Sequence, residues 1–283
     1  MECIRPILIK KSPALAPIKV PCGQCIACRL NRSSSWAMRI MHELKMWKNI
    51  GCFVTFTYDQ ANAPWVNDFQ TTLYYPDIQD FHRNLRRLIS PFTFKFFCAG
   101  EYGGHTGRAH YHVIYFGIPK EVAECIFPDL WGKGHIHVGD ITYDSAMYVA
   151  KYCTKKLNGE KAEVYKAKGI VPEFSRMSRR PGIGATWIEK YAKEVKQHLS
   201  LICKGKEVPV PRYYKDKVYD ENDRLRSRAN SADYYASKEK ALTKEAKFAY
   251  NSFLKGLPES NLEEDRQRTR EQTLLNTLRE RGG

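Results

Sequence analysis

Hydrophobic and polar positions follow two different periods along this chain, and four short stretches have the composition of β-strands. They are rich in β-branched and aromatic residues, and they cover residues 52–58 (CFVTFTY), 93–100 (TFKFFCAG), 109–117 (AHYHVIYFG) and 134–142 (GHIHVGDIT). The glycine-rich EYGGHTGR separates the second stretch from the third. This short connection predicts that the two strands form an antiparallel hairpin.

Other stretches have helical periodicity. In residues 30–50, Trp36, Ile40, Leu44 and Trp47 recur at helical spacing, and Gly51 is expected to end this helix. Further helices are predicted over residues 76–90 with Asp77 as the cap, over 119–130, over 144–157 beginning at Asp144, and around 186–199.

The order of these elements predicts an α+β fold. From residue 51 it runs strand, helix, strand, strand, helix, strand, helix, which favours a compact antiparallel sheet with helices on one face. We expect four regions: residues 1–50 as an N-terminal cysteine-rich segment and helix, 51–160 as the core, 161–211 as a basic glycine-containing loop and helix, and 212–283 as a charged helical tail, where SNLE (260–263) has the form of a capping box.

The charge of the chain indicates a class of partner. Its 283 residues include 46 lysines and arginines against 31 acidic residues, a formal net charge of +15. A field of this size favours a polyanion, most often nucleic acid. No apolar run approaches the roughly 20 residues of a transmembrane helix, and the N-terminal lysines follow the apolar patch, unlike those of a signal peptide. We therefore expect no membrane partner.

Two histidines share one face of a predicted strand. Residues i and i+2 of a strand point the same way, so His110 and His112 project together, with Cα atoms about 6 to 7 Å apart. If the hairpin is symmetric about its loop, Glu101 lies directly across from His110. Two imidazoles and one carboxylate are a ligand set for a divalent metal ion with open coordination positions.

A second pair, His135 and His137, has the same spacing. It is followed by Asp140 on its own strand and has no obvious facing carboxylate, so the first pair is the better candidate. Ligation alone does not name a reaction, because a two-histidine, one-carboxylate site also suits a non-haem iron oxygenase or a zinc hydrolase.

The helix predicted after the fourth strand carries tyrosines that an apolar core does not need. Tyr148 and Tyr152 lie four residues apart and share a face with Lys151 and Lys155. A separate stripe is available for burial, formed by Met147, Ala150, Thr154 and Leu157. Interleaved lysines suit phosphate binding better than a core.

These parts combine into one chemistry. A phenol is a poor nucleophile at neutral pH, but a metal ion held by Glu101, His110 and His112 could polarise a scissile phosphate. A tyrosine could then attack phosphorus, keep the phosphate as a covalent ester and release a 3′ hydroxyl. Such a bond conserves the energy of the broken linkage, so that the strand can be rejoined.

At this point the residues resemble the HUH endonuclease superfamily of rolling-circle replication initiators. FVTFTYD (53–59) is similar to the first motif of that family, HYHVIYFG (110–117) to its histidine motif, and YVAKYCTK (148–155) to its tyrosine motif. Together with SRRPGIG, the segment PCGQCIACRLNRSSSWAMRIMHE looks like the replication initiation protein of gokushoviruses, single-stranded DNA phages of the Microviridae. The resemblance covers roughly residues 20 to 190.

The resemblance implies a five-stranded antiparallel sheet with the histidines on a central strand. It implies Mg²⁺ or Mn²⁺ in the site and metal-dependent nicking and rejoining of single-stranded DNA at a replication origin, in the cytoplasm of a bacterial host. The motif maps the first nucleophile to Tyr152 and its lysine to Lys155, with Tyr148 as a second nucleophile. No G-x-x-x-x-G-K-[ST] occurs, so unwinding would require a separate helicase, that of the host.

Two further features are left by these motifs. Cys22, Cys25 and Cys28 form C-x-x-C-x-x-C, which suits zinc, with Cys3 as a candidate fourth ligand, or an iron–sulfur cluster; three reduced thiols are the alternative. The candidate DNA-binding arginines are Arg108 in the hairpin loop and Arg176, Arg179 and Arg180 before PGIG.

Two functions from other classes stay open at this point. One is a metal-dependent oxygenase or hydrolase built on Glu101, His110 and His112, in which the tyrosines are incidental. The other is a non-catalytic protein that binds single-stranded nucleic acid, in which tyrosines stack on bases and lysines neutralise phosphates.

Overall fold

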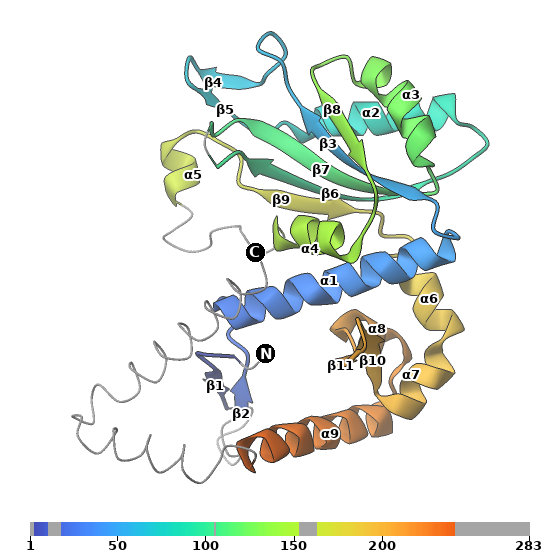
Figure 1. Ribbon diagram of the computed structural model, residues 1–283. Coiled ribbons are helices and arrows are strands. Elements are labelled where there is room, and N and C mark those ends of the chain that lie inside the picture. Colours follow the sequence, from blue (N-terminus) through green and yellow to red (C-terminus); the bar gives the residue numbers. More distant parts are fainter. Residues whose placement is uncertain (1–2, 11–17, 105, 153–162, 241–283) are drawn as a thin grey trace. The chain divides into compact units, whose positions relative to one another are not determined.

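The structure is a computed structural model that describes residues 3–10, 18–104, 106–152 and 163–240; the side chains of residues 18, 152 and 231–240 are outside this description (Figure 1). The chain divides into two units. One contains residues 32–195 and 200–218, and the other contains residues 1–31, 196–199 and 219–283. The predictions for Lys155, for Thr154 and Leu157, and for the capping box at 260–263 lie outside the described residues.

The larger unit contains the predicted antiparallel sheet, and the sheet has five strands. Its spatial order is β8-β3-β7-β6-β9, and every neighbouring pair is antiparallel. Four strands come from the predicted stretches, as β3 (Gly51–Thr57), β6 (Lys95–Tyr102), β7 (Ala109–Phe116) and β8 (Ile136–Gly139). The α+β fold with a five-stranded sheet is therefore confirmed, and β7, which carries the histidines, is its central strand.

The fifth strand corrects the sequence interpretation. Residues 174–177 were predicted as part of a basic loop, but they form β9 (Phe174–Met177) at the edge of the sheet. Four residues with no hydrophobic alternation carry no strand signal of their own. Their conformation comes from the backbone of β6, because Gly100 pairs with Phe174 and Phe97 pairs with Met177.

Helices cover both faces of the sheet, so the prediction that they lie on one face is wrong (Figure 1). On one face, α2 (Tyr75–Leu88) and α3 (Lys120–Trp131) bury Phe81 and Phe127 against Tyr111 and Tyr115 of β7. On the other face, residues of α1 (Ile26–Met46) and α4 (Tyr143–Tyr152) pack against β7; this second cluster includes Ile40, Val149, Ile114 and Phe116. Both sets of alternate residues of β7 are thus buried, which a two-layer fold would not require.

Two helix ends also differ from expectation. Helix α1 ends at Met46, and the chain turns at Lys48 and Asn49, whose φ values of 55° and 62° are left-handed. Gly51 is instead the first residue of β3, where an added Cβ would lie 2.6 Å from the carbonyl oxygen of Tyr115. Asp77 does not cap α2, which has no side-chain cap; its carboxylate accepts a hydrogen bond of 2.8 Å from the hydroxyl of Tyr58.

The buried stripe of α4 is rotated relative to the prediction. Ala146, Val149 and Ala150 are fully buried, whereas Met147 is only partly buried. The helix predicted around 186–199 is divided at Tyr191 into two short helices. The remaining elements are β1 (Ile7–Ile9), β2 (Ile18–Val20), β4 (Trp65–Asn67), β5 (Gln70–Thr71), α5 (Glu163–Ala167), α6 (Ala185–Lys190), α7 (Ala192–His198), β10 (Ser200–Cys203), β11 (Lys206–Pro209), α8 (Arg212–Val218) and α9 (Glu221–Lys240).

Among the helices that the structure describes, we find none that is both long enough and apolar enough to span a bilayer.

A buried histidine makes the fold sensitive to acid. His82 of α2 is 2% exposed, and its Nε2 is hydrogen-bonded to the hydroxyl of Tyr115 at 2.9 Å. Burial, assisted by the charge of Arg86, lowers the pKa of His82 from 6.5 to about 3. Between these two values the unfolded chain binds a proton that the folded chain does not, so the free energy of unfolding decreases as the pH falls from 6.5.

We expect His82→Gln to flatten this acid dependence. A single such group contributes a slope of about 1.4 kcal/mol per pH unit below pH 6.5, and the variant should lose that slope. His42, whose pKa burial lowers to about 4, contributes a second slope that remains. Urea unfolding at a series of pH values between 4.5 and 6.5 measures the difference, with the exposed His198→Gln as the matched control. An unchanged slope in His82→Gln would contradict the assignment.

Candidate metal and nucleophile site

The β6–β7 hairpin has the register that a symmetric loop predicts. Glu101 pairs with His110, and Ala99 pairs with His112. The hairpin is closed by Gly103, whose N–H donates to the carbonyl of Arg108 at 3.0 Å. Side chains alternate along both strands, so Glu101, His110 and His112 project from the same face, the one that α4 covers in part.

The three side chains converge. The Nε2 atoms of His110 and His112 lie 2.7 Å and 3.1 Å from the same oxygen, Oε1 of Glu101. Glu101 is 4% exposed and His112 is 6% exposed. Their ligand atoms all lie within 4.8 Å of one another. The predicted cluster of metal-ligating side chains is therefore present, with the geometry needed to surround a single ion.

Backbone and side-chain partners orient both imidazoles. Nδ1 of His110 lies 3.1 Å from the carbonyl oxygen of Arg108. Because a carbonyl oxygen only accepts, Nδ1 is the donor, and in a neutral imidazole Nε2 then presents a lone pair to Glu101. Two acceptors cannot face each other at 2.7 Å without a cation, either a proton or a metal ion, between them. This arrangement, in which the distal nitrogen is held by an outer partner, is the usual one for metal-ligating histidines.

Thr55 is a positioning residue that the sequence reasoning did not identify. It pairs with His112 across β3 and β7, and its Oγ1 lies 3.0 Å from Nδ1 of His112. Phe53, two residues earlier, stacks on the same imidazole with ring centroids 5.6 Å apart. The only signal in the sequence is the alternation FVTFT, which places a hydroxyl on the face shared with Phe53.

A tyrosine of α4 lies beside the cluster. The ring of Tyr148 is nearly perpendicular to that of His112, with centroids 5.1 Å apart, and 45% of Tyr148 is exposed. Lys151 is exposed one turn further along α4. Tyr152 is the last residue of this helix; its side chain, like the whole of Lys155, lies outside the described residues. The structure thus brings one of the two predicted tyrosines to the histidines.

The rival pair is separate from this cluster. His135 and His137 are exposed, and in the described parts of the chain they join no group of three metal-ligating side chains. His137 pairs with Thr55 on the far side of β3 from β7, so it shares the sheet face of His112.

The candidate DNA-binding arginines do not form one patch. Arg176 pairs with Cys98, which belongs to the cluster under α2 and α3, and its guanidinium lies 5.9 Å from the ring centroid of Tyr75 of α2. It therefore projects from the sheet face opposite Glu101. Arg179 and Arg180 are exposed in the turn after β9. Arg108 is the one connected to the cluster, through its carbonyl, while its Nη2 donates to Oε1 of Gln60 at 3.3 Å.

Comparison with known proteins agrees with this arrangement. A family model for replication-associated proteins of the ORF2 type matches residues 51–157, which run from β3 through α4 and include all three clustered ligands. Replication-associated protein VP4 of Bdellovibrio phage phiMH2K is 32% identical over 252 residues, which cover 76% of each chain. The chain belongs to the family of phage replication-associated proteins. The predicted resemblance to the gokushovirus-like replication proteins of the Microviridae is thereby confirmed.

Two further relatives have the same kind of name. Replication-associated protein ORF2 of Spiroplasma virus 4 is 31% identical over 69% of this chain and 66% of its own length. Replication-associated protein ORF4 of Chlamydia phage 1 is 25% identical over 70% of this chain and 53% of its own length. No solved structure matches the chain significantly.

The hydrogen bond between Thr55 and His112 generates a prediction. Thr55→Val preserves the shape of the side chain and removes the partner of Nδ1, so we expect Mn²⁺ to bind about 10- to 100-fold more weakly, as is usual when an outer partner of a ligating histidine is lost. Thr55→Ser keeps the hydroxyl and should bind as the wild type does. Isothermal titration calorimetry measures both; equal affinities for Thr55→Val and the wild type would show that Thr55 does not position His112.

Proposed function

We propose that this protein initiates rolling-circle DNA replication by nicking single-stranded DNA at an origin and later rejoining it, through a covalent 5′-phosphotyrosine intermediate. The observation that supports this most directly is the contact between Tyr148 and His112, since it puts a candidate nucleophile beside a histidine that shares one carboxylate oxygen with a second histidine. An oxygenase or hydrolase would need the three ligands but has no use for the tyrosine.

Glu101, His110 and His112 would hold the metal ion, for which Mg²⁺ or Mn²⁺ is proposed. One carboxylate and two imidazoles are a donor set that Mn²⁺ accepts and that leaves coordination positions open. When bound, the ion supplies positive charge that stabilises the charge developing on the scissile phosphate. Within the chain, the carbonyl of Arg108 and the hydroxyl of Thr55 keep both Nε2 atoms directed at Glu101.

The bond changes proposed for cleavage balance as follows. The phenolic oxygen of a tyrosine on α4 loses its proton and forms a bond to phosphorus, and the bond from phosphorus to the 3′ oxygen breaks. The 3′ oxygen leaves and takes up a proton, so the products are a phosphotyrosine at the 5′ end and a free 3′ hydroxyl. Tyr148 and Tyr152 are the proposed nucleophiles, and Lys151 and Lys155 are proposed to neutralise the phosphate.

The proposed partner is single-stranded DNA. The net charge of +15 supplies the attraction, and we include Arg108, Arg179 and Arg180 among the phosphate contacts. Arg176, on the opposite sheet face from the histidines, would contact DNA only beyond the site of cleavage. Because the sequence lacks a P-loop, we propose that a host helicase unwinds the duplex and that the protein acts in the cytoplasm of a bacterial host.

A labelled origin-derived oligonucleotide tests the reaction. Incubated with Mn²⁺, the wild type should give a covalent protein–DNA adduct that survives a denaturing gel, whereas a non-catalytic DNA-binding protein or a metal hydrolase should give none. His112→Ala should abolish the adduct because a ligand is lost. The matched control is His137→Ala, an exposed histidine on the same sheet face, which should retain it. The reverse result would mean that the metal site uses the other pair.

Substitution of the tyrosines tests the nucleophile. A double Tyr148→Phe, Tyr152→Phe variant should form no adduct, since a phenyl ring has no attacking oxygen. From the motif, Tyr152→Phe alone should also eliminate the adduct, while Tyr148→Phe should form it but fail in successive rounds. Tyr143→Phe on the same helix, whose hydroxyl contacts Ser34, is the matched control and should behave as the wild type does.

Peptide mapping of the adduct identifies the residue that is used. Mapping to Tyr148 alone would reverse the order of the two tyrosines, and an adduct in the double variant would refute the mechanism.

A further inference from the structure

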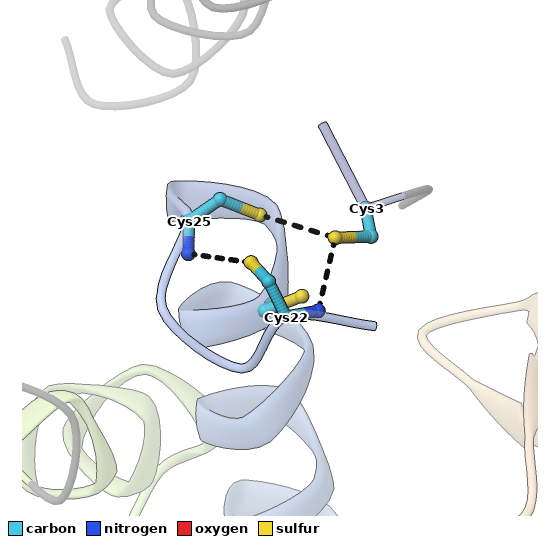
Figure 2. Close-up of side chains that lie close together, drawn as sticks. Cys3, Cys22 and Cys25 are labelled. Carbon is cyan, nitrogen blue, oxygen red and sulfur yellow. Dashed lines mark hydrogen bonds between the residues drawn. The ribbon is translucent and has the colours of Figure 1, made fainter. Parts of the chain in front are cut away.

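Four cysteines meet at the N-terminal end of α1, in the smaller unit. Cys3 precedes β1, Cys22 and Cys25 lie on the turn that leads into α1, and Cys28 lies in its first turn. Figure 2 shows the side chains of Cys3, Cys22 and Cys25 directed toward one another. Cys3 and Cys22 are 19 residues apart in the sequence, so the cluster joins two segments that local structure alone does not bring together.

The spacing of the sulfur atoms fits one tetrahedral ion. All four Sγ atoms lie within 4.8 Å of one another, and those of Cys3 and Cys25 are 3.8 Å apart. Four sulfurs at about 2.3 Å from a central zinc ion lie about 3.8 Å from each other. A disulfide would need about 2.0 Å, and all four cysteines are free. A multi-iron cluster separates its cysteine ligands further than one ion does.

Backbone amides point at the sulfurs, as they do around thiolates. The N–H of Cys22 donates to Sγ of Cys3 at 3.2 Å, and the N–H of Cys25 donates to Sγ of Cys22 at 3.3 Å (Figure 2). The N–H of Gln24 also donates to Sγ of Cys22, at 3.4 Å. Gly23 makes this turn possible with a φ of +75°. These donors stabilise negative charge on sulfur and orient the side chains, the role of outer partners in metal sites.

We propose that Cys3, Cys22, Cys25 and Cys28 bind one Zn²⁺ ion as a closed structural site. Four thiolates complete a tetrahedron and leave no position for water or substrate, so the ion takes no part in chemistry. It ties the segment before β1 to the start of α1 and closes the loop that contains the β1–β2 hairpin. The site is independent of the proposed nicking activity, which uses different ligands in the other unit.

Metal analysis of the full-length protein tests this. Purified under reducing conditions without chelator, the protein should contain about one zinc per chain. Cys3→Ser and Cys28→Ser should lose it, because three thiolates hold the ion less well than four. Cys125→Ser, which removes an exposed cysteine of α3, should retain it. His112→Ala should also retain it, which separates this site from the cluster around Glu101.

A measurement on the wild type covers the case in which a cysteine variant fails to fold. Titration with a thiol-specific mercurial should release zinc, detected with a colorimetric chelator, in step with modification of the cluster thiols. Absence of zinc, iron in its place, or zinc that is lost in His112→Ala and kept in Cys28→Ser would each overturn the proposal.

Discussion

The pairing of Glu101 with His110 across the β6–β7 hairpin is the constraint on which the candidate active site depends. A shift of one residue in this pairing would turn every side chain of one strand to the other face. The packing of β7 prevents that shift, because Tyr111, Val113 and Tyr115 are buried under α2 and α3 while Ile114 and Phe116 are buried on the opposite face. Core packing at one end of the strand therefore keeps the ligands in place at the other.

One face of β7 is divided into an apolar half and a polar half. Ile114 and Phe116 form part of the core under α1 and α4, whereas His110 and His112 continue the same row of side chains beyond it. Helix α4 uses both halves. Ala146 and Val149 bury its inner side in this core, and Tyr148, on the same helix, then meets His112. The apolar contacts that hold the helix also place the phenol beside the histidine.

The two clusters of metal-ligating side chains differ in the ways expected from their proposed roles. Glu101, His110 and His112 offer three ligands of borderline and hard character and leave positions open, as a site that acts on a phosphate requires. The four cysteines offer only soft ligands and close the coordination sphere. In both, backbone groups orient the ligands: the Arg108 carbonyl directs His110, and amide N–H groups direct Cys3 and Cys22. Neither set of ligands is held by side-chain packing alone.

The sequence by itself determined the four longer strands, the hairpin, and the face shared by Glu101, His110 and His112. These are local properties: side-chain alternation needs only neighbouring residues, and a short loop sets the register of the strands that it joins. For the same reason the spacing of Cys22, Cys25 and Cys28 was a sound indication of a cluster. Tertiary structure decided what lies between distant segments. It placed β9 at the sheet edge, helices on both faces, Thr55 on a histidine 57 residues away and Arg176 on the opposite face. Periodicity describes one element at a time, whereas these contacts depend on how several elements pack together.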